Sequence, residues 1–520
     1  MIIKKLSAWR PAAVFFLPIL LLLVALKALH VLWLKPKKTE RLFRSQGLRG
    51  PPYRLLVGNL GEMVSMMLAA SSKPMLPPFS HNIFPRALSF IHQWKKAYGS
   101  AFLLWFGPSP RLVVSSPDLI REIFVSKEEF FDRYEAHPLV RQLEGDGLVN
   151  LRGPKWGLHR KLISPIFQTE NLKLLMPAVG NTMLAMLDEL SAAVPPSSGE
   201  VEVDVADWFQ RLTEDAVTRT TFGRSYDAGK AVFRLQARLM VFAAEAFNRV
   251  FIPGFRFLPT EKNRRRWKLD KEIRENLVGL VNSRRKEAVA GGGEAKDLLG
   301  QMIAGASDDI AVRDIVEECK TFFFAGKQTT TNLLTWTTVL LAMHPDWQDR
   351  AREELFRVCG SRDFPSSDDL PKLKMLGMIV QETLRLYPPA VATIRRAKDD
   401  VSLGRYVVPR GTEVLVPIIA VHHDAELWGP DADRFNPARF SEGASRAARH
   451  PNAFMPFGLG ERTCVGRGLA VVEAKLALAV VIRSFEIRVS PNYIHAPTVL
   501  MMLYPQYGAP VIFRPISRSR

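Results

Sequence analysis

The stretch Phe457–Gly466 reads F-G-L-G-E-R-T-C-V-G and contains Cys464, one of only three cysteines in 520 residues. Glycines stand on both sides of this cysteine, at positions 458, 460 and 466. Because glycine has no side chain, such a loop lets the backbone approach a bound group closely. The thiolate of cysteine is the form that binds metals, and the neighbouring cation Arg462 favours it. The stretch therefore predicts that Cys464 is a metal ligand.

The other two cysteines, Cys319 and Cys359, give no second ligand pattern. The chain has no C-x-x-C and no H-E-x-x-H motif. An odd number of cysteines also argues against a disulfide framework, and their spacing does not support a thiolate zinc site. The competing interpretation of Cys464 is a buried, inert thiol in a glycine-rich turn. A match at five fixed positions of F-x-x-G-x-R-x-C-x-G favours the metal ligand.

This pattern resembles the haem-binding loop of the cytochrome P450 family. The five matching residues are Phe457, Gly460, Arg462, Cys464 and Gly466. The resemblance implies that haem b is the cofactor, that Cys464 ligates its iron and that Arg462 pairs with a haem propionate, with Phe457 in the same cofactor-binding loop. It also implies a mainly α fold, an α-helical bulk with a small β-rich region. We expect residues 53–520 to form one such catalytic domain.

A second motif lies upstream in the sequence Q-E-T-L-R-L. Glu382 and Arg385 are three residues apart in a helical run that ends at Pro388, so they share one helical face. An ordinary surface pair is the alternative, and it would contribute little. About fifty residues later, the segment F-x-P-x-R-F supplies Arg439. In the family, such an E-x-x-R helix and a second arginine form a structural network under the haem.

A third motif is Trp156-x-x-x-Arg160, whose spacing places an indole and a guanidinium on one helical face. These residues resemble the family's pair that binds a haem propionate. Arg395, in a strand predicted after Pro389, resembles a further propionate contact.

The sequence also predicts a long central helix, from an N-cap at Ser307 or Asp308 to a stop at His344-Pro345. Its middle contains glycine and threonine, which are poor helix formers. This segment resembles the oxygen-binding groove above haem iron. The implied catalytic residues are Ala325, Gly326, Gln328 and Thr329. Many monooxygenases have an acid where this chain has Gln328, and an amide orients water but donates no acidic proton. We expect proton relay through Thr329 and ordered water.

The amino terminus predicts a membrane anchor. Residues 12–34 are almost all apolar, and about twenty such residues cross a bilayer as a helix. A cleaved signal peptide is the alternative, but no small-residue cleavage site follows. We therefore expect a short lumenal segment (1–11), a transmembrane signal anchor (12–34) and a basic, proline-containing linker (35–52). Basic residues are more numerous after the span than before it, which places the catalytic domain in the cytosol. The resemblance implies the membrane of the endoplasmic reticulum.

The formal charge of +19 is spread along the chain, and no nucleic-acid-binding module accompanies it. We therefore expect no nucleic acid partner, and we attribute the charge to contact with membrane lipid and an acidic electron donor. The chain lacks a G-x-G-x-x-G fingerprint and an appended flavin domain. Electrons for O2 activation must then come from a separate NADPH-cytochrome P450 reductase. The basic residues expected to attract it are Arg152, Lys155, Lys161 and Arg467.

Three longer stretches, which begin at Phe322, Leu384 and His495, narrow the resemblance to plant brassinosteroid C-26 hydroxylases. The implied reaction is oxidation of C-26 of a C-22 hydroxylated brassinosteroid, which inactivates this steroid hormone. An apolar pocket for such a sterol is expected from Val391, Ala392, Ile394, Val499 and Leu500. Two alternatives remain open. One is a hydroxylase of a cytokinin, gibberellin or fatty acid, and the other is a haem isomerase or sterol carrier that oxidises nothing.

The metal-ligand prediction is tested by Cys464→Ser. Because a hydroxyl is a poor substitute for a thiolate ligand, the variant should keep part of its fold and lose the long-wavelength carbonyl band of a thiolate haem. A carbon monoxide difference spectrum measures this band. A band of unchanged position would contradict the assignment.

Overall fold

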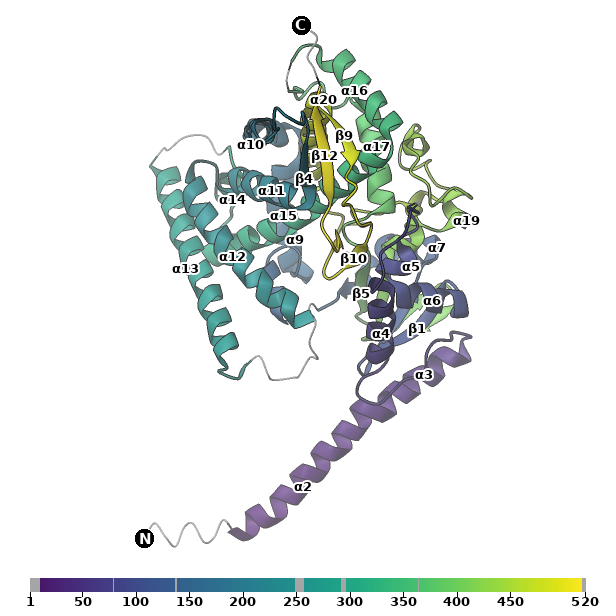
Figure 1. Ribbon diagram of the computed structural model, residues 1–520. Coiled ribbons are helices and arrows are strands. Elements are labelled where there is room, and N and C mark those ends of the chain that lie inside the picture. Colours follow the sequence, from purple (N-terminus) through teal and green to yellow (C-terminus); the bar gives the residue numbers. More distant parts are fainter. Residues whose placement is uncertain are drawn as a thin grey trace. The chain divides into compact units, whose positions relative to one another are not determined.

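Figure 1 shows the computed structural model, which describes residues 10–77, 79–135, 138–247, 257–290, 296–362 and 364–516. Side chains are not described for residues 10–17 and 243–247. Residues 1–9, most of the predicted lumenal segment, lie outside the described residues. The fold is mainly helical with four small sheets in the described part of the chain, which confirms the predicted fold class.

The chain divides into two compact units. Unit 1 comprises Met1–Ser72, Leu88–Tyr134 and Ala392–Pro417, and unit 2 comprises Lys73–Ala87, Glu135–Val391 and Ile418–Arg520. The expectation of a single catalytic domain over 53–520 stays a prediction.

Unit 1 contains the amino-terminal helices and a β-rich part. Its helical elements are α2 (Arg10–Leu29), η1 (His30–Leu34), α3 (Lys35–Ser45), α4 (Leu60–Ser71), α6 (Ser89–Tyr98), α7 (Pro117–Arg121), η2 (Glu122–Ser126) and η3 (Glu128–Phe130). Its strands are β1 (Ala101–Phe106), β2 (Ser109–Val114), β3 (Phe131–Arg133), β5 (Thr393–Ala397), β6 (Val401–Leu403), β7 (Tyr406–Val408) and β8 (Glu413–Val416). Five of these strands form one sheet in the order β1-β2-β8-β5-β3, in which β2 and β8 are parallel and the other pairs antiparallel, and β6 pairs with β7.

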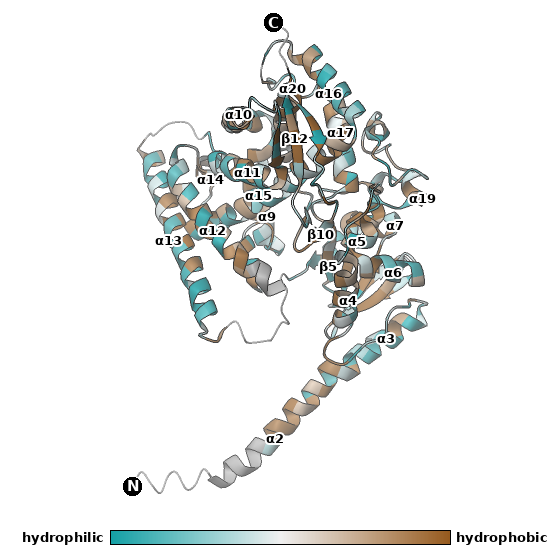
Figure 2. Cartoon of the chain, viewed as in Figure 1, coloured by the Kyte–Doolittle hydropathy of each residue, from teal (hydrophilic) through white to brown (hydrophobic). Residues whose placement is uncertain are grey.

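The amino-terminal helix is longer than the sequence predicted. Helix α2 continues through the π-helical turn η1 into α3, so the first 11 residues of the predicted linker are helical. Figure 2 shows the change from a hydrophobic α2 to a more hydrophilic α3. Among the described residues, Pro18–Ser45 is the one helix long and apolar enough to cross a membrane. The predicted anchor is therefore present as a suitable helix.

The chain after this helix is fixed by close packing. The Tyr53 hydroxyl donates a hydrogen bond of 2.5 Å to the carbonyl of Leu32, and its ring packs against Trp33 and Trp105. Gly50 lies so close to β1 that an added Cβ would be 1.8 Å from the carbonyl oxygen of Leu103. The Gly-Pro-Pro exit from the anchor is thus a packed segment of unit 1.

Unit 2 holds most of the helices. They are α5 (Phe84–Ala87), α8 (Pro138–Glu144), α9 (Gly153–Ile163), η4 (Ser164–Phe167), α10 (Thr169–Ala192), α11 (Val205–Phe222), η5 (Gly223–Ser225), α12 (Tyr226–Phe247), α13 (Glu261–Val289), α14 (Leu298–Gly305), α15 (Val312–Met343), α16 (Pro345–Cys359), α17 (Lys374–Leu386), α18 (Ile418–His422), α19 (Ala425–Trp428), η7 (Pro437–Phe440), η8 (Pro451–Ala453) and α20 (Arg467–Ser484). Its strands form a three-stranded sheet and a two-stranded sheet. They are β4 (Val201–Asp204), β12 (Pro510–Pro515) and β9 (Phe485–Val489), in that order, and β10 (Pro497–Val499) with β11 (Leu503–Pro505).

Helix α15 is the core helix of unit 2, and α11 packs along it more extensively than any other element in the described residues (Figure 1). The prediction of an N-cap near Ser307 or Asp308 is wrong, because the N-cap is Ala311 and the first helical residue is Val312. The Asp314 carboxylate accepts a hydrogen bond of 3.1 Å from the backbone N–H of Ala311. This contact stabilises the helix start at Ala311, where the sequence offers no N-cap side chain. The predicted stop at His344 is confirmed.

Helices α15 and α20 meet at a buried carboxyl group. The hydroxyl of Thr330 lies 3.5 Å from Oε2 of Glu473, and both residues are buried. Burial raises the pKa of Glu473 to about 8, because the charged form is desolvated. The native protein therefore keeps this group protonated at neutral pH.

This protonation makes a prediction about stability. A raised acid pKa contributes stability below the unfolded-state value, near 4.5, and this contribution is lost as pH rises through about 8. The wild-type protein should lose about 1.4 kcal/mol per pH unit from this group between roughly pH 5 and 8. Glu473→Gln, which does not titrate, should lack this loss in unfolding measurements across that range. The exposed Glu353→Gln is the control, and equal pH slopes in Glu473→Gln and wild type would contradict the account.

Candidate active site

The loop before α20 presents the Cys464 thiol at the amino end of that helix. The backbone N–H of Cys464 donates a bond of 2.9 Å to the carbonyl of Phe457, which closes the loop. Gly458 and Gly460 have φ of 76° and 72°, a left-handed conformation that side chains disfavour. Helix α20 then begins at Arg467, directly after Gly466 and three residues beyond the cysteine. The loop geometry thus fixes where the sulfur lies.

The predicted role of the glycines, close approach of the backbone to a bound group, stays a prediction. An added Cβ at Gly458 would meet no atom within 4 Å, and one at Gly466 would lie 3.9 Å from the Cys464 sulfur. Close approach of protein atoms therefore explains neither glycine. Gly458 is required by its positive φ, whereas the φ of Gly466 is −82°.

Two opposing effects act on the Cys464 thiol. Desolvation raises its pKa, although the residue is accessible by surface area. A side chain that is both accessible and desolvated faces a space enclosed largely by protein. Backbone N–H groups of Gly466 and Arg467 and the cations Arg160 and Arg467 lower the pKa. Arg462, the cation expected from the sequence, is not among these causes.

Helix α9 packs against this loop through the two residues of the W-x-x-x-R motif. Arg160 donates a hydrogen bond of 2.9 Å to the carbonyl of Thr463, next to Cys464. The guanidinium of Arg462 stacks over the Trp156 ring at 4.4 Å and donates to the carbonyl of Leu151 at 3.1 Å. The structure therefore brings Trp156, Arg160 and Arg462 together beside the cysteine.

The middle of α15 has an accessible face within a buried helix. From Ile315 to Ala342 every residue is buried except Ala325, Gly326, Gln328 and Thr329. These four are the residues that the sequence predicted as catalytic. Positions 325 and 329 are one turn apart and so lie on one helical face. These four residues are partly accessible, so neighbouring side chains leave this face of the helix incompletely covered.

Neighbouring residues of the same segment point toward α11. The ammonium group of Lys327 is buried and forms an ion pair with Glu214 of α11. An added Cβ at Gly326 would lie 3.1 Å from a methyl carbon of Val217, also in α11. Glycine at this position therefore permits close packing of two helices, a role that the sequence analysis did not assign to it.

The polar groups of the accessible face are held by the helix itself. The Thr329 hydroxyl donates a bond of 2.6 Å to the carbonyl of Ala325, four residues earlier. The Gln328 amide donates a bond of 3.3 Å to the side-chain oxygen of Asn332. A hydroxyl that donates to the helix still has lone pairs that can accept a proton or a hydrogen bond.

The structure also brings together the predicted structural network. Glu382 and Arg385, both fully buried in α17, form two hydrogen bonds of 2.7 and 2.8 Å. Arg439 Nε lies 3.4 Å from the same carboxylate. Arg385 also donates to the carbonyls of His422 and Ala432. A buried ion pair with this many partners fixes the segments around it, because breaking it would strand a charge.

Arg395 and part of the predicted substrate pocket belong to unit 1, whereas the residues above belong to unit 2. In β5, the Arg395 guanidinium stacks over Phe124 at 4.5 Å. Ala392 and Ile394 belong to the same unit. In unit 2, Val391 is buried and Val499 ends strand β10, with Leu500 following it. The pocket formed by these five residues stays a prediction.

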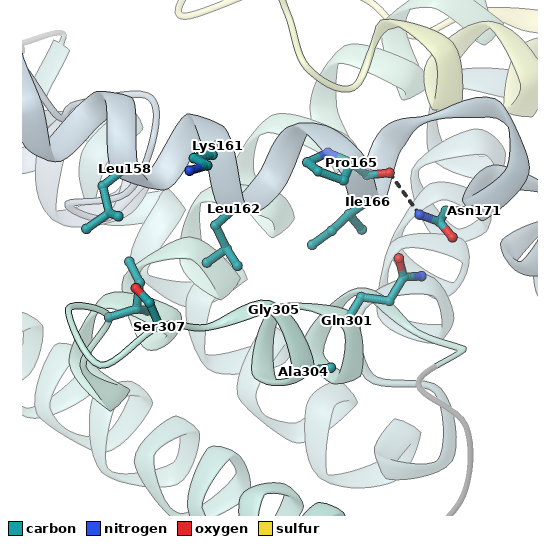
Figure 3. A pocket seen from close by; sticks show the side chains of 11 residues that line it. Leu158, Lys161, Leu162, Pro165, Ile166, Asn171, Gln301, Ala304, Gly305 and Ser307 are labelled. Atoms are coloured by element: carbon teal, nitrogen blue, oxygen red, sulfur yellow. Dashed lines mark hydrogen bonds between the residues drawn. The ribbon is translucent and has the colours of Figure 1, made fainter.

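A cavity of about 530 Å³ lies between α9, η4 and α14 (Figure 3). Leu158 and Leu162 line it from the face of α9 opposite Trp156 and Arg160. Its remaining lining residues are Lys161, Pro165, Ile166, Asn171, Gln301, Ala304, Gly305, Ser307 and Ile310. None of these lining residues is a predicted catalytic or cofactor-binding residue.

Comparison with known proteins assigns the family. The family model described as Cytochrome P450 matches residues 79–507. The chain therefore belongs to the cytochrome P450 family and is a monooxygenase.

Within the family, the chain is similar to plant proteins of the 734A subfamily. It is 61% identical to cytochrome P450 734A6 of Oryza sativa subsp. japonica over 96% of this chain and 95% of the relative. It is 60% identical to cytochrome P450 734A1 of Arabidopsis thaliana over 98% of each. Cytochrome P450 72A13 of Arabidopsis thaliana is more distant, at 40% identity over 94% of this chain and 95% of the relative.

The family implies a haem-thiolate cofactor, and the residues around Cys464 fit one. The accessible Cys464 supplies a soft thiolate donor for iron. Arg160 and Arg462 supply cations for the carboxylates of a porphyrin. The accessible face of α15 supplies a polar surface in an otherwise buried helix.

The loop geometry makes a testable prediction. Gly458→Ala should destabilise the protein by about 1–2 kcal/mol, because alanine disfavours φ of 76°. The carbonyl band should not move, since the new methyl group meets no atom. Gly157→Ala, in helix α9 with open space around it, should instead stabilise by roughly 0.5–1 kcal/mol. Thermal unfolding measures both, and equal effects of the two variants would contradict the conformational explanation.

Proposed function

We propose that this protein is a haem-thiolate monooxygenase that oxidises C-26 of C-22 hydroxylated brassinosteroids and thereby inactivates them. The observation that carries the oxygen-activating part is the accessible face Ala325–Thr329 on a buried helix. The substrate is supported by the similarity to the 734A subfamily and by the three hydroxylase-like stretches beginning at Phe322, Leu384 and His495.

The chain's own residues would divide the work as follows. Cys464 holds the iron of haem b, with Phe457 in the same loop. Trp156, Arg160 and Arg462 hold a haem propionate, and Arg395 supplies a further propionate contact. When bound, a haem-thiolate group supplies the cleavage of dioxygen that produces an oxidant for unactivated C–H bonds.

Proton delivery would fall to the α15 face. One hydroxylation consumes the substrate R–H, O2, two electrons and two protons, and gives R–OH and water. The Thr329 hydroxyl accepts a proton from ordered water through an oxygen lone pair and then donates its own proton. Gln328 orients that water, since its amide has both a donor and an acceptor. Ala325 and Gly326 leave room beside them, because neither has a bulky side chain.

The two electrons would come from NADPH through a membrane-bound cytochrome P450 reductase. Four basic residues support an acidic partner near α9 and the start of α20. Lys155 is already paired with Asp314 at 2.6 Å, so its charge is partly compensated. Lys161 and Arg467 are exposed and make no ion pair within the described part of the chain. These two residues therefore contribute most to the attraction.

The membrane location follows from the anchor helix. We infer that Pro18–Ser45 carries a single pass through the membrane of the endoplasmic reticulum, with the catalytic residues in the cytosol. The excess of lysine and arginine after the apolar stretch supports this orientation. An apolar steroid would reach the enzyme by way of the lipid.

A substrate panel tests the proposal. Membranes with reductase should convert C-22 hydroxylated brassinosteroids to C-26 oxidised products, identified by mass spectrometry, and only with NADPH and O2. Preferred turnover of a cytokinin, a gibberellin or a fatty acid would assign a different hydroxylase. Turnover without NADPH or O2 would favour an isomerase, and binding without turnover would favour a sterol carrier.

The role of Thr329 is tested by replacement with alanine. Thr329→Ala should bind the sterol with nearly unchanged affinity but release peroxide, with product per NADPH falling about tenfold or more. Thr337→Ala is the matched control, because its hydroxyl also donates to the carbonyl four residues earlier, at 2.7 Å, but is buried. Unchanged coupling in Thr329→Ala would remove this threonine from the mechanism.

A further inference from the structure

A buried hydrogen-bonded pair joins helices α9 and α15. His159 Nδ1 lies 2.6 Å from Oε1 of Glu318, and each side chain is 1% exposed. In the described part of the chain, His159 Nε2 and Glu318 Oε2 have no hydrogen-bond partner. The two groups thus depend on each other for their hydrogen bonds. Burying polar atoms without hydrogen-bond partners lowers the free energy of unfolding, so a gain in stability does not explain why this pair is present.

The charged groups around the ring come from the same two helices. On α15, Asp314 Oδ1 lies 3.9 Å from His159 Nε2, one turn before Glu318. On α9, Lys155 pairs with Asp314 at 2.6 Å and is largely exposed. The contact between α9 and α15 therefore comprises two pairs, Lys155 with Asp314 and the buried His159 with Glu318.

His159 lies on α9 between residues that contact the cysteine loop. The next residue, Arg160, is rotated about 100° around the helix and bonds to Thr463 beside Cys464. Trp156, three residues before His159, stacks with Arg462. Helix α9 is therefore attached to the cysteine loop by one set of residues and to α15 by His159.

The attachment point on α15 is close to the accessible face. Glu318 precedes Ala325 by seven residues, which is two helical turns or about 10 Å. The cysteine loop and the accessible face of α15 are the parts of the site that face the cofactor. His159 and Glu318 set the separation between α15 and the helix that carries Arg160.

We propose that His159 and Glu318 are positioning residues that hold α9 against α15 and so retain the haem between the cysteine loop and α15. The inference rests on the proposed haem site, and it adds two residues that do not touch the cofactor. Their effect passes through Arg160 and Trp156 on one side and the α15 face on the other. No sequence motif assigned a role to either residue.

The test measures haem retention in the full-length protein, as the rate of haem transfer to excess apomyoglobin. His159→Leu should accelerate transfer at least about tenfold, because Glu318 is left buried and unpaired and α9 is released. His159→Asn should restore a rate within about threefold of wild type, because the Asn amide N–H can replace the Nδ1 donor.

Two further variants separate positioning from stability. Arg284→Gln breaks another buried pair, with Asp297 at 2.8 Å, which joins α13 to the start of α14. The pair's further hydrogen bonds go to Phe222, Ser225 and Gly300, which lie outside α9 and α15. It should lower the unfolding temperature yet leave haem transfer within about threefold of wild type. The double variant His159→Leu/Glu318→Leu removes both buried polar groups, so it should recover thermal stability and still lose haem rapidly.

The outcomes are distinct. Transfer from His159→Leu no faster than from Arg284→Gln would overturn the proposal, and so would slow transfer from the double variant. Wild-type protein that binds no haem would overturn the proposed function together with this inference. Wild-type protein with a normal thiolate haem and unaffected variants would overturn the inference alone.

Discussion

The position of the Cys464 sulfur at the amino end of α20 is the constraint on which the rest of the site depends. Desolvation raises the pKa of this thiol, and backbone N–H groups with nearby arginines lower it. A metal ion would complete this balance in favour of the thiolate. The left-handed glycines, the hydrogen bond from Cys464 to Phe457 and the start of α20 all serve to hold one sulfur atom in one place.

Helix α15 supplies the second part of the proposed site, and its burial determines how firmly that part is held. A helix with nearly all of its residues packed has few ways to move, so its accessible face is presented rigidly. Two residues of the segment contribute to this rigidity, since Lys327 pairs with α11 and Gly326 packs closely against it. The predicted catalytic residues and the residues that fix the helix therefore lie in the same five-residue segment, Ala325–Thr329.

The sequence predicted local features better than distant contacts. Spacing alone placed Glu382 and Arg385 on one face, because a helix relates such neighbours directly. The start of α15 was misplaced, since the stabilising contact at Ala311 comes from an aspartate inside the helix. The pairing of His159 with Glu318 joins residues 159 positions apart, and no local pattern encodes it.

The most direct test of the account concerns the atom bound to iron. X-ray absorption at the iron edge of the purified, haem-loaded protein reports which elements surround the metal. Ligation of haem iron by Cys464 predicts one sulfur neighbour in the wild-type protein, and its loss in a variant that lacks Cys464. Iron surrounded only by nitrogen and oxygen in the wild-type protein would contradict the account at its foundation.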